Sequence, residues 1–388
     1  MKIGFILTYF HPFTDGTENN CLYLARELSK KHEVHIFTSD RRDGKIIEQK
    51  EELFQGVHIH RCKTILRYKY YLVWDINLIP KLMKYDLDIL HVHSIGFLQQ
   101  DLGVLLKKIF TNTKIINTPH GPFLANNYYN FIIKLLKEIY RWIEFLLNRY
   151  CYDAVIDVNN RQRKWMKRFG FTEKQIKFCP DGIPRDRFKK IENKNFIKKH
   201  DLKNKFVICS LGRLIPYKGF EQIIKVLPEI IKKHPNIIYL HMGPDRGDLT
   251  RLKILAKDLK VNKHIKFLGM VSEDDKLRGL DVSKIFIFTS EPGTEAFGIV
   301  MLEAMARGNS LISTKVEEDN ILVEQGINGF IYDYGDLKEL KEKLLYLIEN
   351  KKINQQMQKE NLKRSKELIN EDITWNYLEK IYKEVLTK

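Results

Sequence analysis

The sequence lacks the features that mark secreted, disulfide-rich and membrane-spanning proteins. It has only five cysteines in 388 residues, an odd number without a CxxC pair, so we expect reduced thiols in a core rather than disulfides or a zinc framework. No run of 18 or more apolar residues occurs, which argues against a spanning helix. The chain enters a strand-like run at residues 3–8 without a signal-peptide layout. These absences predict a cytoplasmic protein.

Acidic residues are also scarce relative to basic ones. Lysine and arginine number 66 against 49 aspartates and glutamates, which gives a formal net charge of +17. One explanation is a lysine-rich proteome with thermophile-like surfaces. The other is attraction to anions such as sugar nucleotides, anionic lipid headgroups or nucleic acid. No nucleic-acid-binding motif accompanies the charge, so we expect no nucleic-acid partner.

Strand-like and helix-like runs alternate in two series, separated by a polar stretch over 184–205. Alternation of this kind predicts parallel sheets, and the length suits two domains. We expect an α/β protein with two doubly wound, Rossmann-like domains, residues 1–184 and 185–369, and a terminal helix near 370–388. The expected strands are 2–7, 34–38, 57–61, 88–93, 114–117, 154–158, 176–179, 206–211, 237–242, 265–268, 285–289 and 311–313. The expected helices are 20–31, 96–110, 128–150, 161–168, 220–234, 249–259, 298–307, 337–349 and 374–386.

Two segments of the second series carry the main candidate binding groups. Arg213 and Lys218 follow an apolar strand-like run, and Glu295 and Glu303 bracket the start of a helix at Gly298. By spacing alone, the two basic residues have a simpler explanation as solvated surface residues. The two glutamates could likewise be partners of the helix dipole. However, strand-end loops are where α/β folds bind ligands, and a helix N-terminus with an Arg and a Lys suits a diphosphate. With glutamates to accept hydrogen bonds from hydroxyls, the set predicts a site for a nucleoside-diphosphate sugar.

Read together with further segments, these two resemble the retaining family-four glycosyltransferases, which have the GT-B fold of two Rossmann-like domains facing a cleft. The further segments are Asp15-Gly16-Thr17-Glu18, Asp88-Ile89-Leu90-His91-Val92-His93, Thr118-Pro119-His120-Gly121, Pro180-Asp181-Gly182-Ile183 and a terminal helix with Trp375. The resemblance implies that this helix crosses back to the first domain. It also implies metal-independent, retaining transfer of a hexosyl group from a nucleoside-diphosphate sugar to a glycan, lipid-linked or small-molecule acceptor, with no further cofactor.

The resemblance assigns donor-binding roles in the second domain. Glu303 would bind the ribose hydroxyls and Glu295 the donor sugar. The amides of Phe297, Gly298 and Ile299 would meet the phosphates. Relatives often carry a glycine pair where this chain has the acids of 316–319, so the identity of the sugar is not predicted.

Four residues are expected to act in catalysis: His120, Arg213, Lys218 and Glu295. Arg213 and Lys218 would neutralise the leaving nucleoside diphosphate. His120 would position groups near the transferred sugar rather than act as the main base, because the leaving phosphate takes the proton in the mechanism usually proposed for the family. Gly16 would approach the diphosphate, although Asp15 replaces the first glycine usual there.

Three patterns typical of metal sites are interpreted as structural. Asp86-Leu87-Asp88 has the Asp-x-Asp pattern of the other large glycosyltransferase fold, but here it begins a strand of the first domain. Two histidine pairs each alternate onto one strand face, and no third ligand is evident for either. These pairs are His58 with His60 and His91 with His93. We therefore expect no metal site.

The helix expected over 128–150 has a narrow polar stripe and a wide apolar face. Such a helix is typically buried. The alternative is peripheral contact with an anionic membrane at its inner face, together with the basic-aromatic run 67–71.

The sequence leaves two alternatives to a glycosyltransferase function. One is a GT-B sugar-nucleotide epimerase, and the other is a non-catalytic basic protein that binds anionic lipid or nucleic acid.

Overall fold

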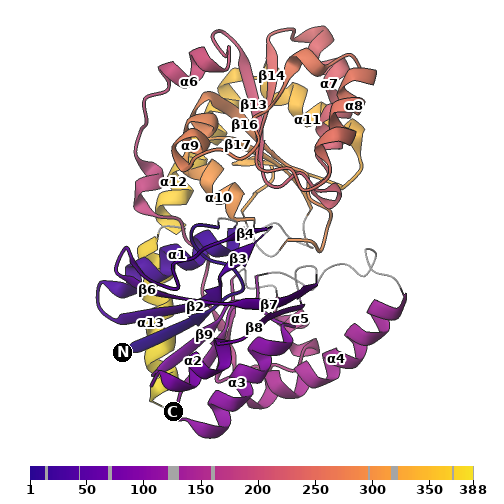
Figure 1. Cartoon of the computed structure of the whole chain (residues 1–388). Coiled ribbons are helices and arrows are strands. Elements are labelled where there is room, and N and C mark those ends of the chain that lie inside the picture. The colour runs from indigo at the N-terminus through magenta and orange to yellow at the C-terminus, as the bar shows by residue number, and fades with distance from the viewer. Residues whose placement is uncertain are drawn as a thin grey trace. The chain divides into compact units, whose positions relative to one another are not determined.

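The computed structural model describes residues 1–13, 16–42, 44–68, 72–120, 131–158, 162–295, 298–315, 322–368 and 371–387. The chain divides into two compact units, which Figure 1 shows. Unit 1 comprises Met1–Gly182 and Glu371–Lys388, and unit 2 comprises Ile183–Asn370. The division falls close to residues 184 and 370, where the sequence pattern changes.

Unit 1 is built on an eight-stranded sheet in the order β12-β11-β10-β9-β1-β2-β6-β5. Its strands are β1 (Lys2–Ile6), β2 (Glu33–Ser39), β5 (Glu51–Phe54), β6 (Val57–Cys62), β9 (Ile89–Val92), β10 (Lys114–Asn117), β11 (Ala154–Asp157) and β12 (Ile176–Phe178). Neighbouring strands pair in parallel except β5, which lies antiparallel to β6 at one edge. The parallel strands were all predicted. The edge strand β5 was not, because its two glutamates interrupt the apolar signal.

Two small antiparallel pairs were also missed by the prediction. They are β3 (Arg41–Arg42) with β4 (Lys45–Ile46) and β7 (Thr64–Tyr68) with β8 (Leu72–Asp75).

Six helices cover the described part of the unit 1 sheet. They are α1 (Gly16–Ser29), α2 (Leu78–Lys84), α3 (Leu98–Phe110), α4 (Phe131–Tyr150), α5 (Arg163–Arg168) and α13 (Glu371–Leu386). The terminal helix α13 contacts α1, and its Tyr382 hydroxyl lies 2.6 Å from His91 Nδ1 on β9. The end of the chain is thereby part of unit 1. Within the described residues, no helix combines the length and the apolar composition needed to cross a bilayer.

Unit 2 has a six-stranded, all-parallel sheet in the order β15-β14-β13-β16-β17-β18. Its strands are β13 (Phe206–Leu211), β14 (Ile237–Met242), β15 (Ile265–Phe267), β16 (Ser283–Phe288), β17 (Ser310–Thr314) and β18 (Gly329–Tyr332). Its α-helices are α6 (Lys194–Lys199), α7 (Glu221–Lys233), α8 (Leu249–Asp258), α9 (Glu273–Val282), α10 (Ile299–Ala306), α11 (Leu337–Glu349) and α12 (Lys351–Leu368). Its 3₁₀ turns are η2 (Arg185–Phe188), η3 (Pro216–Lys218) and η4 (Asn262–His264).

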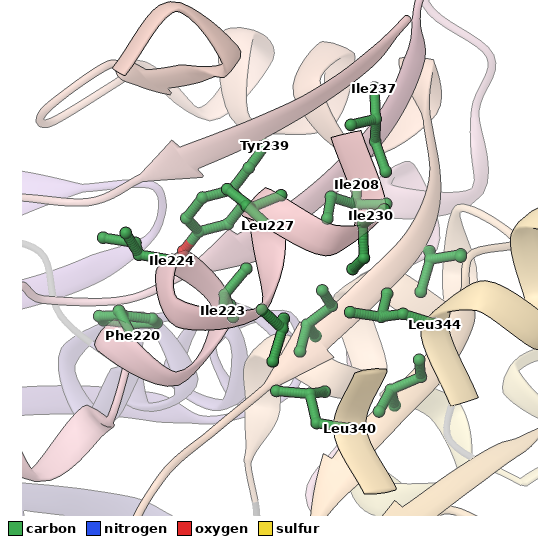
Figure 2. Close-up of a cluster of buried hydrophobic side chains, with 14 of the residues drawn as sticks. Ile208, Phe220, Ile223, Ile224, Leu227, Ile230, Ile237, Tyr239, Leu340 and Leu344 are labelled. Atoms are coloured by element: carbon green, nitrogen blue, oxygen red, sulfur yellow. The ribbon is translucent and has the colours of Figure 1, made fainter. Parts of the chain in front are cut away.

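The core of unit 2 forms where α7 packs against the sheet. Figure 2 shows Ile223, Leu227 and Ile230 of α7 together with Ile208 of β13 and Tyr239 of β14. The three helical residues recur at spacings of three and four, so they share one side of α7. This packing holds β13 firmly, and β13 carries the loop with Arg213 and Lys218.

Two sequence interpretations are wrong. The stretch 184–205, interpreted as a polar linker, belongs entirely to unit 2. It contains η2 and α6, and its Phe196 and Leu202 are buried. Its few apolar residues do not give a periodic signal. The second error concerns α4, for which burial of the apolar side was favoured over the alternative of membrane contact. Ile139, Trp142 and Leu146 are all more than half exposed.

Candidate functional site

The candidate site of unit 2 lies where the strand order of its sheet reverses. The strands β13 and β16 are neighbours, with β14 and β15 on one side and β17 and β18 on the other. The carboxyl ends of strands at such a reversal form the ligand crevice of open α/β sheets. Arg213 and Lys218 follow β13, and Ser290 and Glu295 follow β16. The topology therefore brings the two predicted segments to one sheet edge.

Lys218 and Glu295 contact each other directly. Their side chains form an ion pair and are only 12 % and 18 % exposed. The Ser290 hydroxyl also donates to Glu295 Oε1 at 3.2 Å. Arg213 Nη2 donates to the Tyr217 hydroxyl at 3.4 Å on the same loop as Lys218. Lys218 and Glu295, which come from separate segments of the sequence, are thus in direct contact in the structure.

Gly219 allows the two loops to approach closely. Its φ of 66° lies in the left-handed region, and a Cβ there would stand 2.4 Å from the Thr289 carbonyl oxygen. The Thr289 hydroxyl in turn donates to the Lys218 carbonyl at 2.6 Å. A side chain at Gly219 would push Lys218 away from the loop that carries Glu295.

Gly298 and Ile299 open the helix α10. Gly298 is its N-cap with a φ of 79°, and no side chain at that cap bonds to the first helical N–H groups. Such N–H groups are suited to bind an anion. Phe297, which was expected to contribute an amide, lies outside the described residues, as do Asp15 and the acids of 316–319.

Glu303 is held by a partner that the sequence did not reveal. It is 4 % exposed, and Lys276 Nζ of α9 donates to its Oε1 at 2.5 Å. Lys276 is buried as well and also contacts Glu273 at 2.9 Å. Lys276 lies far from Glu303 in sequence, within a run of charged residues that resembles any solvated helix, so no local signal marks it.

His241 of β14 is a second supporting residue that the sequence analysis missed. Its Nε2 donates to the Gly212 carbonyl at 3.0 Å, and its Nδ1 lies 2.9 Å from the Ser210 hydroxyl. Burial lowers the pKa of His241 to about 3, so the ring stays neutral and can donate and accept at once. It fixes the backbone just before Arg213.

Unit 1 has a strand reversal of its own. The strand order reverses between β1 and β9, and Gly16 follows β1, His93 follows β9 and His120 follows β10. No described atom lies within 4 Å of the position that a Cβ on Gly16 would take. Gly16 therefore offers the open backbone expected of a residue that a ligand approaches.

The His120 side chain forms a hydrogen bond with another histidine. Its Nε2 lies 2.8 Å from His93 Nδ1, and the two rings are stacked. Neighbouring His91 lies between the Tyr382 and Thr118 hydroxyls. Burial lowers the pKa of His120 to about 4 and that of His91 to about 3. Both rings are neutral at pH 7, which suits hydrogen bonding better than acid catalysis.

The interpretation of the histidine pairs needs one correction. A third group does lie beside His93 and His120, because one ligand atom each from Cys21, His93 and His120 falls within 4.8 Å of the others. The two histidines already bond to each other, and burial raises the pKa of the Cys21 thiol well above its usual range. A metal ion would have to displace the hydrogen bond and the thiol proton.

The other two metal-like patterns lie away from the site. His60 contacts Glu51 and lies 2.9 Å from His35. Asp88 accepts from the Lys2 amide at 2.7 Å, and both Asp88 and the exposed Asp86 precede β9. They are therefore at the amino edge of the sheet, opposite the strand ends that carry His93 and His120.

Comparison with known proteins adds to this geometry. A family model described as Glycosyltransferase Family 4 matches residues 14–187, and one described as Glycosyl transferases group 1 matches residues 192–364. The chain is 25 % identical to an uncharacterized glycosyltransferase of Methanocaldococcus jannaschii, over 98 % of this chain and 96 % of that protein. It is 23 % identical to phosphatidyl-myo-inositol mannosyltransferase of Mycobacterium leprae, over 90 % of this chain and 88 % of that protein.

A solved structure has the same fold. HepE of Anabaena, in complex with UDP and glucose, superposes with a TM-score of 0.80 at 17 % identity, covering 99 % of this chain and 100 % of that one. The predicted fold class and enzyme class are confirmed. The two family models follow one another along the chain, and together with these glycosyltransferase relatives they show that the protein belongs to glycosyltransferase family 4 and has the GT-B fold.

Proposed function

We propose that this glycosyltransferase, which transfers a sugar from a nucleotide sugar, moves a hexosyl group with retention and without a metal ion. The acceptor would be a glycan, a lipid-linked sugar or a small molecule. One observation carries the proposal: Lys218 contacts Glu295 at the strand reversal of unit 2. Arg213 is on the loop of Lys218, and α10 begins just after Glu295.

Donor binding would replace the existing contacts between protein side chains with contacts to the donor. Lys218 would turn from Glu295 to a phosphate oxygen, and Glu295 would accept a hydrogen bond from a sugar hydroxyl instead. Arg213 would bind the diphosphate bidentately, and the amides at Gly298 and Ile299 would add hydrogen bonds. Glu303 would use one carboxylate oxygen for a ribose hydroxyl while Lys276 holds the other.

The reaction would exchange one bond at the anomeric carbon for another on the same face. The bond from this carbon to the diphosphate oxygen breaks, the acceptor oxygen forms the new bond, and the acceptor proton passes to the leaving diphosphate. Arg213 and Lys218 would stabilise the negative charge that grows on the diphosphate, the role that a divalent cation has in other enzymes. His120, neutral at pH 7, would orient the reacting groups.

The same proposal includes a cytoplasmic location with peripheral contact at the inner membrane face. All five cysteines are free and buried, which fits a reducing compartment. The net charge of +17 favours anionic lipid. One relative carries a name that denotes a phosphatidylinositol acceptor.

The first test is a thermal-shift screen of sugar nucleotides, in which the true donor raises the melting temperature by mass action. With that donor, NMR of the product identifies the anomer, and an inverted product would refute retention. The test variant is Lys218→Met and its control is Lys263→Met, since Lys263 is exposed and precedes β15, at the opposite sheet edge. Only Lys218→Met should slow transfer. Epimerised donor without any acceptor product would instead favour the epimerase.

A further inference from the structure

The helix α4 presents its apolar residues to solvent. Seven large apolar side chains, spaced mostly three or four residues apart and therefore on one side of the helix, are between 51 % and 69 % exposed. They are Leu135, Leu136, Ile139, Trp142, Ile143, Leu146 and Tyr150. A water-exposed helix normally has the opposite arrangement, with its apolar stripe on the core.

Polar residues fix the other side of α4 to the body of unit 1. The Tyr140 hydroxyl donates to Asp101 Oδ2 of α3 at 2.5 Å, and Asn148 Nδ2 donates to the Phe169 carbonyl at 2.9 Å. Asn148 is itself buried. Turning the helix to bury its apolar side would break both hydrogen bonds and leave buried polar groups without these partners. The outward orientation is therefore built into the structure.

The end of α3 extends this surface. Ile109 and Phe110, at the end of α3, are 61 % and 69 % exposed. The helices α3 and α4 lead into β10 and β11, which are paired parallel neighbours, so their last residues lie at one sheet edge. Lys108 of α3 contacts Asp153, just after α4, at 2.9 Å. Figure 1 shows the two helices beside each other in unit 1. We call the nine residues together the α3–α4 apolar face.

We propose that the α3–α4 apolar face docks on an anionic membrane surface, with α4 lying in the interfacial plane. Monomeric proteins rarely leave apolar patches of this kind uncovered. A membrane is favoured over a second copy of the chain because a net charge of +17 makes two copies repel each other, whereas anionic lipids attract it. Trp142 and Tyr150 belong to the residue types that prefer the membrane interface. The inference rests on the proposed membrane contact and does not depend on the proposed catalytic activity.

The experiment compares two substitutions that are matched in exposure. Ile139 of α4 and Ile254 of α8 are each 56 % exposed on a helix, so Ile139→Glu and Ile254→Glu should disturb the fold equally little. Sedimentation with vesicles of phosphatidylglycerol and phosphatidylcholine measures binding, with pure phosphatidylcholine as the uncharged control. We expect the wild type and Ile254→Glu to bind the anionic vesicles, and Ile139→Glu to bind about tenfold or more weakly.

Tryptophan fluorescence locates the contact. Brominated lipid should quench emission from Trp142 in bound wild-type protein, and Trp142→Phe should abolish most of that quenching. Ile139→Glu binding as tightly as the wild type, or a wild type that ignores anionic vesicles, would overturn the proposal. So would a wild-type dimer that Ile139→Glu converts to a monomer without weaker vesicle binding, since the face would then join two copies.

The result is separable from the proposed reaction. A water-soluble acceptor should be glycosylated equally well by the wild type and Ile139→Glu, because the face is not part of the donor site. Loss of vesicle binding with retained turnover supports the docking role. A wild type that binds vesicles but transfers no sugar from any donor would refute the reaction and leave the docking surface standing.

Discussion

Replacing Glu303 by glutamine tests whether this residue serves the donor, the fold or both. Glutamine keeps the shape and one oxygen acceptor but removes the charge. In the structure Glu303 and Lys276 are both nearly inaccessible to water, with Nζ and Oε1 at 2.5 Å. The substitution therefore leaves the Lys276 ammonium buried with Glu273 as its remaining charged partner among the described contacts, at 2.9 Å.

The size of the effect follows from this geometry. Removing one partner of a buried pair costs about 3–5 kcal/mol when the other charge is left alone. Because Glu273 remains near Lys276, we expect Glu303→Gln to lower the free energy of unfolding by about 2–3 kcal/mol. Lys276→Met should cost a similar amount, since it leaves the Glu303 carboxylate buried without its cation. The double variant should be less destabilised than the sum, by about 1–2 kcal/mol.

Urea unfolding of the four proteins gives this coupling, and calorimetry with the donor gives the affinities. If Glu303 also binds ribose, Glu303→Gln should weaken donor binding more than Lys276→Met does, because only the first changes a group that touches the ligand. Additive stability losses would refute the ion pair. Equal donor affinities for the wild type and Glu303→Gln would remove Glu303 from the binding site.

Three further predictions concern charge. Burial raises the pKa of Asp101 from 3.8 to about 7. The folded state therefore holds a proton that the unfolded state loses, and the free energy of unfolding falls as the pH rises from about 4 to 7. In urea unfolding, the stability of Asp101→Asn relative to the wild type should increase by about 2–3 kcal/mol between pH 5 and pH 8. Lys218→Met should lower kcat about ten- to thousandfold, and a silent substitution would contradict its role. Excess chelator and Asp86→Ala should each leave turnover unchanged, and loss of activity with either would argue for a metal-dependent reaction.

All the parallel strands except β18, and the strand-end positions of the main candidate site residues, were predictable for a physical reason. A parallel strand covered on both faces is a nearly continuous apolar run, as Phe206–Leu211 of β13 and Ile89–Val92 of β9 are. The residues after such runs necessarily lie at the ligand-binding edge of the sheet. Hence Lys218 and His120 could be selected from the sequence. Their direct partners, Glu295 and His93, were named as well, but the contacts themselves required the structure.

Supporting residues escaped prediction because their contacts join segments distant in sequence. Lys276 supports Glu303 from α9, a helix that was itself missed because few apolar residues interrupt its charged ones. Its N-cap Ser272 accepts from the Asp275 amide at 3.1 Å, a capping signal that the apolar pattern did not reinforce. His241 supports Gly212 from the neighbouring strand β14. Nothing in the sequence around either residue specifies its partner.

Two helices show what hydrophobic periodicity can and cannot decide. Helix α12 was missed because polar side chains take part in its buried side. Its Asn361 is fully buried, and the side-chain amide donates to the Asn309 and Asn328 carbonyls at 2.7 Å. Helix α4 was predicted, but with the wrong side facing inward, because Tyr140 and Asn148 hold its polar side to the body of unit 1. Periodicity shows that a helix has two unlike sides, whereas buried hydrogen-bond partners decide which one faces the core. An apolar side that such hydrogen bonds leave exposed to solvent is suited to contact another apolar surface, and this is the physical basis of the proposal that α4 docks on a membrane.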